Sequence, residues 1–226
     1  MSKPLFRLVL ALLIGPLISI SLQGQSPTRF QEEINQFKAD KTDYSKSKNL
    51  ILFTGSSTIR MWTSLKDDFP ERNVLNRGFG GSYMSELLYY ADTLILPYKP
   101  RIIFIYEGDN DLGSGQKADD ILESARLLVE KIHRKLPHST ICFFSAKPSL
   151  ARWNLHETFV DFNRRLEQFT RKYKRVYYLD TWTPMIGADG NVKNDLFLAD
   201  GLHMNRKGYD IWKEAVNEFL DHKLKR

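Results

Sequence analysis

The sequence predicts an α/β fold in three layers, an α/β/α sandwich whose five-stranded parallel sheet has helices on both faces. From Asn49 onward, short apolar runs alternate with longer amphipathic segments. The short runs lack a strict polar–apolar alternation, which is typical of strands covered on both faces. Strands separated by helices pair in parallel through right-handed crossovers.

The five strands are expected where the apolar runs are rich in Ile, Val, Phe and Tyr, residues that favour strands. These runs are residues 50–54, 74–76, 102–106, 140–145 and 176–179. Apolar residues recur at helical spacing between and after them, over residues 121–132, 159–169 and 209–219.

The amino terminus, residues 1–25, is expected to be a signal peptide. Lys3 and Arg7 precede an uncharged apolar run over residues 8–22. Such a run is short for a membrane-spanning helix, which needs roughly 20 residues. An uncleaved anchor is the alternative. We therefore expect export to the periplasm or the medium, with no stable membrane span after cleavage of the leader.

Residues 26–48 are expected to form a short helix and a linker, because Phe30, Ile34 and Phe37 follow helical spacing. The single domain then covers residues 49–226. Its only cysteine, Cys142, excludes an intramolecular disulfide. The net charge of +6 comes from basic residues scattered along the chain. Scattered charge indicates a solvated surface and gives no reason to expect a nucleic-acid partner.

Residues with chemical potential follow the strands, at the sheet edge where parallel sheets bind ligands. Gly55-Ser56-Ser57 ends the first strand and opens a helix. A serine there is near free backbone N–H groups that stabilise an anion, or it caps the helix. The glycine-rich stretch 78–82 after the second strand allows close backbone approach to a ligand, or forms a plain tight turn.

The third strand ends in Glu107-Gly108-Asp109-Asn110-Asp111. Three interpretations are open for it: a divalent-cation loop, an Asn110 amide that stabilises an oxyanion, or a turn that satisfies its own backbone. The ligand spacing of an EF-hand is missing.

His203 is preceded by Asp200, with Gly201 between them. A short loop can bring the carboxylate to Nδ1 and leave Nε2 free to accept a proton from a hydroxyl. A lone Asp-x-x-His is common, so the interpretation depends on its occurring together with the other three segments.

Together, four segments resemble the four sequence blocks of the SGNH (GDSL-type) hydrolases, in the family's order. They are Gly55-Ser56-Ser57, Gly78-Phe79-Gly80-Gly81, Gly108-Asp109-Asn110-Asp111 and Asp200-Gly201-Leu202-His203. The resemblance covers about residues 50 to 220. It is nearest to bacterial esterases similar to platelet-activating-factor acetylhydrolases and lysophospholipase L1. The stretch Lys147-Pro148-Ser149-Leu150-Ala151-Arg152 after the fourth strand also resembles that group.

The resemblance implies a flavodoxin-like topology and a serine esterase that needs no metal and no cofactor. Ser57 would be the nucleophile, His203 the general base and Asp200 the residue that orients it. The backbone N–H groups of Ser57 and Gly81, with the Asn110 amide, would form the oxyanion hole. One departure is Ser56, which stands where the family has Asp.

The substrate implied is a small-molecule or glycan ester with a short acyl group, such as acetyl, on a sugar or a lipid-like alcohol. Its contacts are not readable from the sequence, and the candidates are large side chains near the four segments: Trp62, Phe79, Tyr83, Arg152 and Trp153. The alternatives are a lysophospholipase or thioesterase with the same triad, a non-catalytic glycan-binding module, and a metal-dependent phosphohydrolase using Glu107, Asp109 and Asp111.

Overall fold

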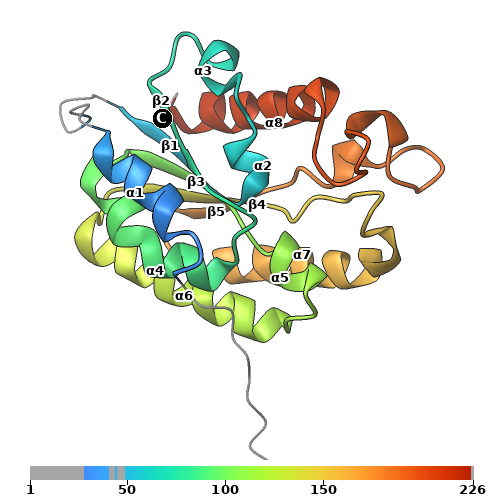
Figure 1. Ribbon diagram of the computed structural model, residues 1–226, viewed down its shortest axis with the longest axis horizontal. Helices are drawn as coiled ribbons and strands as arrows, with labels where there is room; N and C mark the ends of the chain where they lie inside the picture. Colours follow the sequence, from blue (N-terminus) through green and yellow to red (C-terminus); the bar gives the residue numbers. More distant parts are fainter. Residues whose placement is uncertain (1–27, 41–43, 45–48, 225–226) are drawn as a thin grey trace, which may run out of the picture.

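One parallel sheet forms the centre of the molecule in the computed structural model, which describes residues 28–40, 44 and 49–224 (Figure 1). Its strands are β1 (Ile51–Gly55), β2 (Val74–Gly78), β3 (Ile102–Tyr106), β4 (Thr140–Phe144) and β5 (Val176–Leu179). All neighbouring strands run parallel, in the order β2-β1-β3-β4-β5. The five predicted strands are therefore confirmed.

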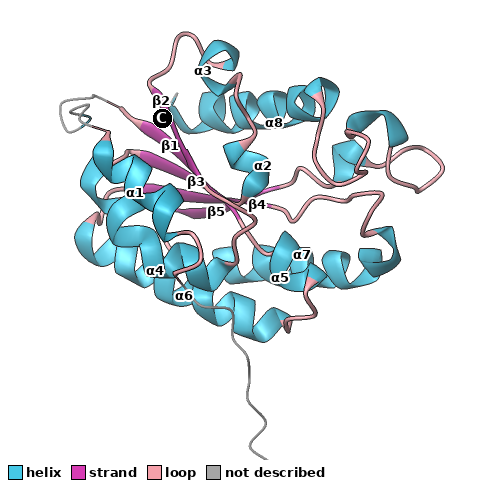
Figure 2. Ribbon diagram, in the orientation of Figure 1, coloured by secondary structure: helices cyan, strands magenta, loops and turns pink. Residues whose placement is uncertain are grey.

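Helices cover both faces of this sheet, which confirms the three-layer prediction (Figure 2). On one face lie α1 (Gln31–Ala39), α4 (Met84–Leu94), α6 (Ala118–Lys135) and α7 (His156–Thr170). On the other lie α2 (Ser57–Arg60), α3 (Leu65–Asp68) and α8 (Arg206–Leu224). The remaining elements are short: α5 (Asp109–Gly113), and the 3₁₀ turns Leu96–Tyr98, Trp153–Leu155, Thr183–Met185 and Asn194–Leu196.

Stacked aromatic rings fill the core between the sheet and α8. The Phe53 and Phe104 ring centroids lie 4.7 Å apart, and those of Phe144 and Trp212 lie 4.4 Å apart. All four side chains are fully buried. Large buried rings contribute strongly to core stability, so the strands that carry the site are rigidly supported.

The predicted amino-terminal helix is present as α1. Ile34 is fully buried, and Phe30 packs edge-on against Phe79 at 5.4 Å between ring centroids. The expected signal peptide lies outside the described residues. Within the described part of the chain, no helix is both long enough and apolar enough to cross a membrane.

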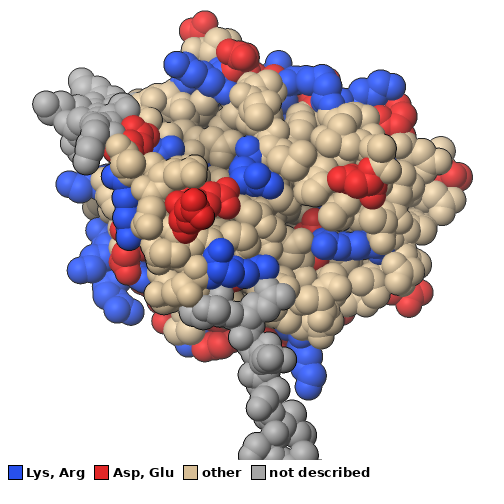
Figure 3. All heavy atoms as spheres, viewed as in Figure 1, with Lys and Arg blue, Asp and Glu red and all other residues tan. Residues whose placement is uncertain are grey.

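The strand order places a topological switch between β1 and β3, since the chain leaves β1 toward one edge of the sheet and continues from β3 toward the other. Ligands of such sheets bind at the carboxyl ends of the strands beside the switch. The segments after β1 and β3 contain Ser57 and Asn110. On the face shown in Figure 3, Lys and Arg side chains are dispersed among Asp and Glu, with no continuous basic surface.

Candidate active site

Ser57 is the first residue of α2, immediately after a sharp turn of the backbone. Gly55 has φ +125°, and a Cβ there would lie 2.0 Å from the Tyr106 carbonyl oxygen, so only glycine fits. Ser56 precedes the helix and makes no side-chain capping bond. Ser57 Oγ instead lies 3.0 Å from His203 Nε2, which favours the chemical interpretation over a simple helix cap.

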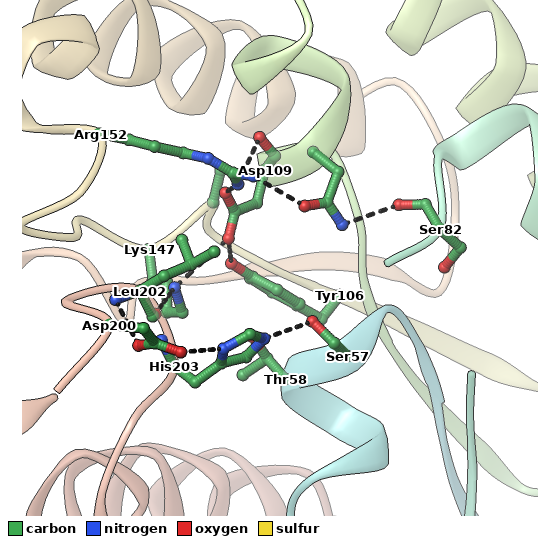
Figure 4. A network of polar contacts seen from close by, with 12 residues as sticks. Ser57, Thr58, Ser82, Tyr106, Asp109, Lys147, Arg152, Asp200, Leu202 and His203 are labelled. Carbon is green, nitrogen blue, oxygen red and sulfur yellow. Dashed lines mark hydrogen bonds and ion pairs between the residues drawn. The ribbon is translucent and has the colours of Figure 1, made fainter. Parts of the chain in front are cut away.

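His203 is oriented by Asp200, as the resemblance implied. Gly201 has φ +63°, a conformation that folds the short loop back on itself. One carboxylate oxygen of Asp200 accepts the backbone N–H groups of Leu202 and His203, both at 2.9 Å. The other lies 2.6 Å from His203 Nδ1, so that Nε2 faces Ser57 (Figure 4).

The same contacts stabilise the charge on Asp200. The hydrogen bond to His203, followed by the two backbone N–H groups, lowers the pKa of Asp200 to about 2. The carboxylate is therefore ionised at neutral pH, and its exposure to solvent favours the same form. An ionised acceptor at Nδ1 fixes the ring tautomer in which Nε2 can take a proton.

The glycine-rich segment after β2 is held by the amino-terminal region. The Gly80 N–H donates to Glu33 Oε2 at 3.0 Å, and Arg29 Nη2 donates to the Gly81 carbonyl at 3.0 Å. A Cβ on Gly81 would lie 3.7 Å from Asn110 Nδ2. Gly81 therefore lies beside Asn110, whereas the backbone N–H of Gly80 is already hydrogen-bonded to Glu33.

Asn110 follows β3 and is held at both ends of its amide. Its Oδ1 accepts a hydrogen bond from Arg152 Nη2 at 3.0 Å, and its Nδ2 donates to the Ser82 carbonyl at 3.1 Å. An amide nitrogen carries two hydrogens, so one N–H remains available. The side chains of Ser57, Asn110 and His203 thus come from the start of α2, from α5 and from the loop before α8, all at one edge of the sheet.

The three carboxylates around Asn110 have separate partners, which does not fit a shared cation site. Asp109 forms ion pairs with Lys147 and Arg152. Glu107 accepts the Ser82 hydroxyl at 2.6 Å, and Asp111 accepts the Met84 N–H at 3.0 Å. Among the described residues, no cluster of His, Cys, Asp and Glu has a geometry suited to a metal ion.

Burial raises the pKa of two of these acids. It raises the pKa of Glu107 well above its usual range, and the nearby Asp111 raises it further. Burial also raises the pKa of Asp111 to about 7. A raised pKa favours the neutral form of a buried acid, whereas a cation ligand needs the ionised form.

Two of the candidate substrate contacts are wrong. Trp62 and Phe79 are fully buried in the core, and Trp62 Nε1 donates to Asp68 at 2.7 Å. Side chains without exposed surface cannot line a surface site. Tyr83, Arg152 and Trp153 are partly exposed, and their contact with a substrate stays a prediction.

The sequence interpretation missed the role of Lys147, which follows β4. Its side chain is 0% exposed, and Nζ donates to the Leu202 carbonyl at 2.8 Å, next to His203. Burial lowers its pKa to about 7. Lysine is almost never fully buried unless it is paired, but the sequence alone did not show that this one is buried.

The chain belongs to the GDSL-like lipase/acylhydrolase family, whose family model matches residues 52–211. This match includes Ser57, Asn110, Asp200 and His203. It supports a hydrolase of the esterase type. No curated protein matches the chain in sequence at a significant level.

Solved structures share the fold at low sequence identity. A GDSL-like lipase from Bacteroides thetaiotaomicron is 16% identical with a TM-score of 0.73, covering 88% of this chain and all of that one. A lipase/acylhydrolase from Enterococcus faecalis is 16% identical with a TM-score of 0.65, covering 77% and 96%. An acetylxylan esterase from Geobacillus stearothermophilus is 16% identical with a TM-score of 0.63, covering 77% and 94%.

Proposed function

We propose that this protein is a serine esterase that hydrolyses carboxylic esters with short acyl groups through an acyl-enzyme intermediate. The observation that carries the proposal is the chain of contacts from Ser57 Oγ to His203 Nε2, 3.0 Å, and from His203 Nδ1 to Asp200, 2.6 Å. A hydroxyl is a poor nucleophile until an adjacent base takes its proton, and this geometry provides such a base.

In the first half of the reaction, Ser57 Oγ bonds to the ester carbonyl carbon while its proton passes to His203 Nε2. The carbonyl oxygen becomes an oxyanion, which the N–H groups of Ser57 and Gly81 and the Asn110 amide stabilise. The engagement of the Gly80 N–H by Glu33 supports Gly81 as the donor. The bond to the alkoxy oxygen then breaks, and His203 protonates the departing alcohol.

In the second half, His203 takes a proton from water as the water oxygen bonds to the acyl carbon. The second oxyanion collapses, the bond to Ser57 Oγ breaks, and the proton returns to the serine. The products are a carboxylic acid and the free enzyme. Besides the ester and one water molecule, these steps need only side-chain and backbone groups of the site.

A cavity of about 440 Å³ beside the catalytic loop supports a bulky alcohol part in the substrate. Leu150 and Trp153 line it together with residues of the 187–194 segment. Leu150 packs against this loop, since a Cβ on Gly201 would lie 3.1 Å from its Cβ. Aromatic and amide side chains suit a sugar, and the acetylxylan esterase of similar fold supports a carbohydrate ester.

The test is the release of p-nitrophenol from acetyl, butyryl and octanoyl esters by the wild-type protein and by Ser57→Ala. We expect hydrolysis by the wild type, greatest for the acetyl ester, and none above background for Ser57→Ala. Ser85→Ala, an exposed serine in α4, is the matched control and should keep full activity. Wild-type activity in Ser57→Ala contradicts the proposal, and a maximum at the octanoyl ester favours the lysophospholipase or thioesterase alternative.

We also propose that the enzyme is exported after removal of residues 1–25. The uncharged apolar run after Lys3 and Arg7 supports this. Cell fractionation with mass measurement of the mature chain tests it, and a full-length chain confined to the cytoplasm contradicts it.

A further inference from the structure

A row of three charged side chains, Lys147, Asp109 and Arg152, joins the loop that carries His203 to the segment that carries Asn110 (Figure 4). At one end, Lys147 Nζ donates to the Leu202 carbonyl at 2.8 Å, one residue before His203. The same Nζ lies 3.3 Å from Asp109 Oδ2, which also accepts the Tyr106 hydroxyl at 2.6 Å. The other carboxylate oxygen of Asp109 accepts Arg152 Nη1.

The other end of this row reaches Asn110. Arg152 Nη1 also donates to the Asp109 carbonyl, and Nη2 donates to Asn110 Oδ1, both at 3.0 Å. On the opposite side, the Ser82 carbonyl accepts Asn110 Nδ2 at 3.1 Å. An amide turned by 180° would place its NH₂ against the guanidinium and its oxygen against the Ser82 carbonyl. Both contacts would be repulsive, because neither facing pair would contain a donor and an acceptor.

Arginine suits this position better than lysine does. Its planar guanidinium presents several donors in a fixed arrangement, so one side chain holds Asp109 and Asn110 at the same time. A lysine ammonium is a point charge and can keep the ion pair with Asp109 without fixing the amide. The Arg152 side chain is 20% exposed, and two of its nitrogens already donate to protein oxygens.

We propose that Arg152 is a positioning residue that orients the Asn110 amide so that its remaining N–H points to the oxyanion. Asp109 and Lys147 connect this arginine to the loop that carries His203, so donor and base are held in one rigid frame. The inference rests on the proposed esterase function and assigns Arg152 a role through Asn110 instead of a contact with the substrate.

A double-mutant cycle of Arg152→Lys and Asn110→Ala tests this role through kcat and KM for p-nitrophenyl acetate. Loss of a whole oxyanion donor costs about 10²–10³ in kcat. We expect Arg152→Lys alone to lower kcat by about 10-fold with little change in KM, since the amide remains but is no longer fixed. In the Asn110→Ala background the same change should cost less than about 3-fold, because there is no amide left to orient.

Two kinetic results would overturn the inference. Equal losses in both backgrounds would show that Arg152 acts independently of Asn110. A raised KM with unchanged kcat would show that it binds the substrate. Arg165→Lys is the control, because Arg165, like Arg152, forms ion pairs with aspartate, here Asp119 and Asp161, but lies on α7 away from the site. It should leave both constants unchanged.

A crystal structure of Arg152→Lys provides a readout that does not depend on turnover. Arg152→Lys keeps a positive charge near Asp109, so the fold should be retained, and a thermal melt checks this. We expect the Asn110 amide to leave the Ser82 carbonyl. An amide that stays in place without the guanidinium contradicts the inference, even if the wild-type protein hydrolyses none of the esters tested.

Discussion

At the scale of single residues, the candidate site depends on a few hydrogen bonds at one edge of the sheet. Asp200 is the most exposed of its members, with 48% of its side chain accessible, whereas His203 is 23% exposed. An exposed carboxylate is screened by water and interacts less strongly than a buried one. Asp200 therefore acts mainly through the geometry that it gives to the imidazole ring.

This exposure leads to a graded expectation for Asp200→Asn. Replacing a buried triad carboxylate by the amide lowers kcat on the order of 10⁴-fold, since it stabilises the wrong tautomer. We expect a smaller loss here, about 10²–10³, because solvent can partly compensate. Steady-state kinetics with p-nitrophenyl acetate measures the effect. A loss of less than about 3-fold would show that Asp200 does not orient His203.

Several site residues could be predicted from the sequence, and others could not. Ser57, Asn110, Asp200 and His203 follow strands or precede the last helix in recognisable local segments. Lys147, Arg152 and Glu33 contribute through partners 55, 42 and 47 residues away in the sequence. No local pattern encodes such contacts. The prediction that Trp62 and Phe79 contact the substrate was wrong for the same reason, because the burial of a side chain depends on residues far away in the sequence.

At the scale of elements, the amino-terminal region matters because it holds the glycine-rich segment in place. Arg29 forms an ion pair with Glu86, whose side chain is only 4% exposed, and donates to the Gly81 carbonyl. Glu33 of α1 accepts the Gly80 N–H. The sequence predicted this helix from its apolar spacing, but not that its polar residues would fix a loop of the site.

Removing one of these polar contacts should weaken catalysis without abolishing it. We expect Arg29→Met to lower kcat by about 10-fold, less than the loss of a donor itself, because the Gly81 N–H remains but is less firmly held. It should also lower the melting temperature, since buried Glu86 loses its ion-pair partner and, among the described residues, keeps only the hydrogen bond from the Tyr83 N–H. Glu32→Ala, an exposed acid of α1, is the control. An unchanged kcat in Arg29→Met would show that the loop keeps its position unaided.

At the scale of the whole molecule, the strands could be predicted because a short, mostly apolar run marks each of them and helices cover both faces of the sheet. The boundaries of the connecting 3₁₀ turns could not, since they depend on packing. One connection between distant parts is Asp68 of α3, which accepts Trp62 Nε1 at 2.7 Å, Ser64 Oγ at 2.8 Å and Arg206 Nη2 at 2.5 Å. It attaches α3 to the start of α8.

This connection predicts a pH dependence of stability. Burial alone would raise the pKa of Asp68, but hydrogen bonds from Arg206, Trp62 and Ser64 lower it from 3.8 to about 2. The folded state therefore favours the ionised carboxylate. The stabilisation is present above pH 3.8 and is lost as the pH falls through about 2, amounting to about 2 kcal/mol.

Urea denaturation at pH 5 and pH 2.5 measures this contribution. Asp68→Asn should be less stable than the wild type at pH 5, and the difference between the two proteins should narrow at pH 2.5. An equal difference at both values would show that ionisation of Asp68 does not contribute to folding.

The central claim is that Ser57 is a nucleophile activated by His203. The most direct measurement is covalent labelling with a fluorophosphonate, which reacts with activated serines, followed by peptide mass spectrometry. We expect a single adduct on Ser57, and its loss in His203→Ala although the hydroxyl is still present. An adduct on another serine, or labelling of Ser57 that is equally fast without His203, would show that His203 does not activate Ser57.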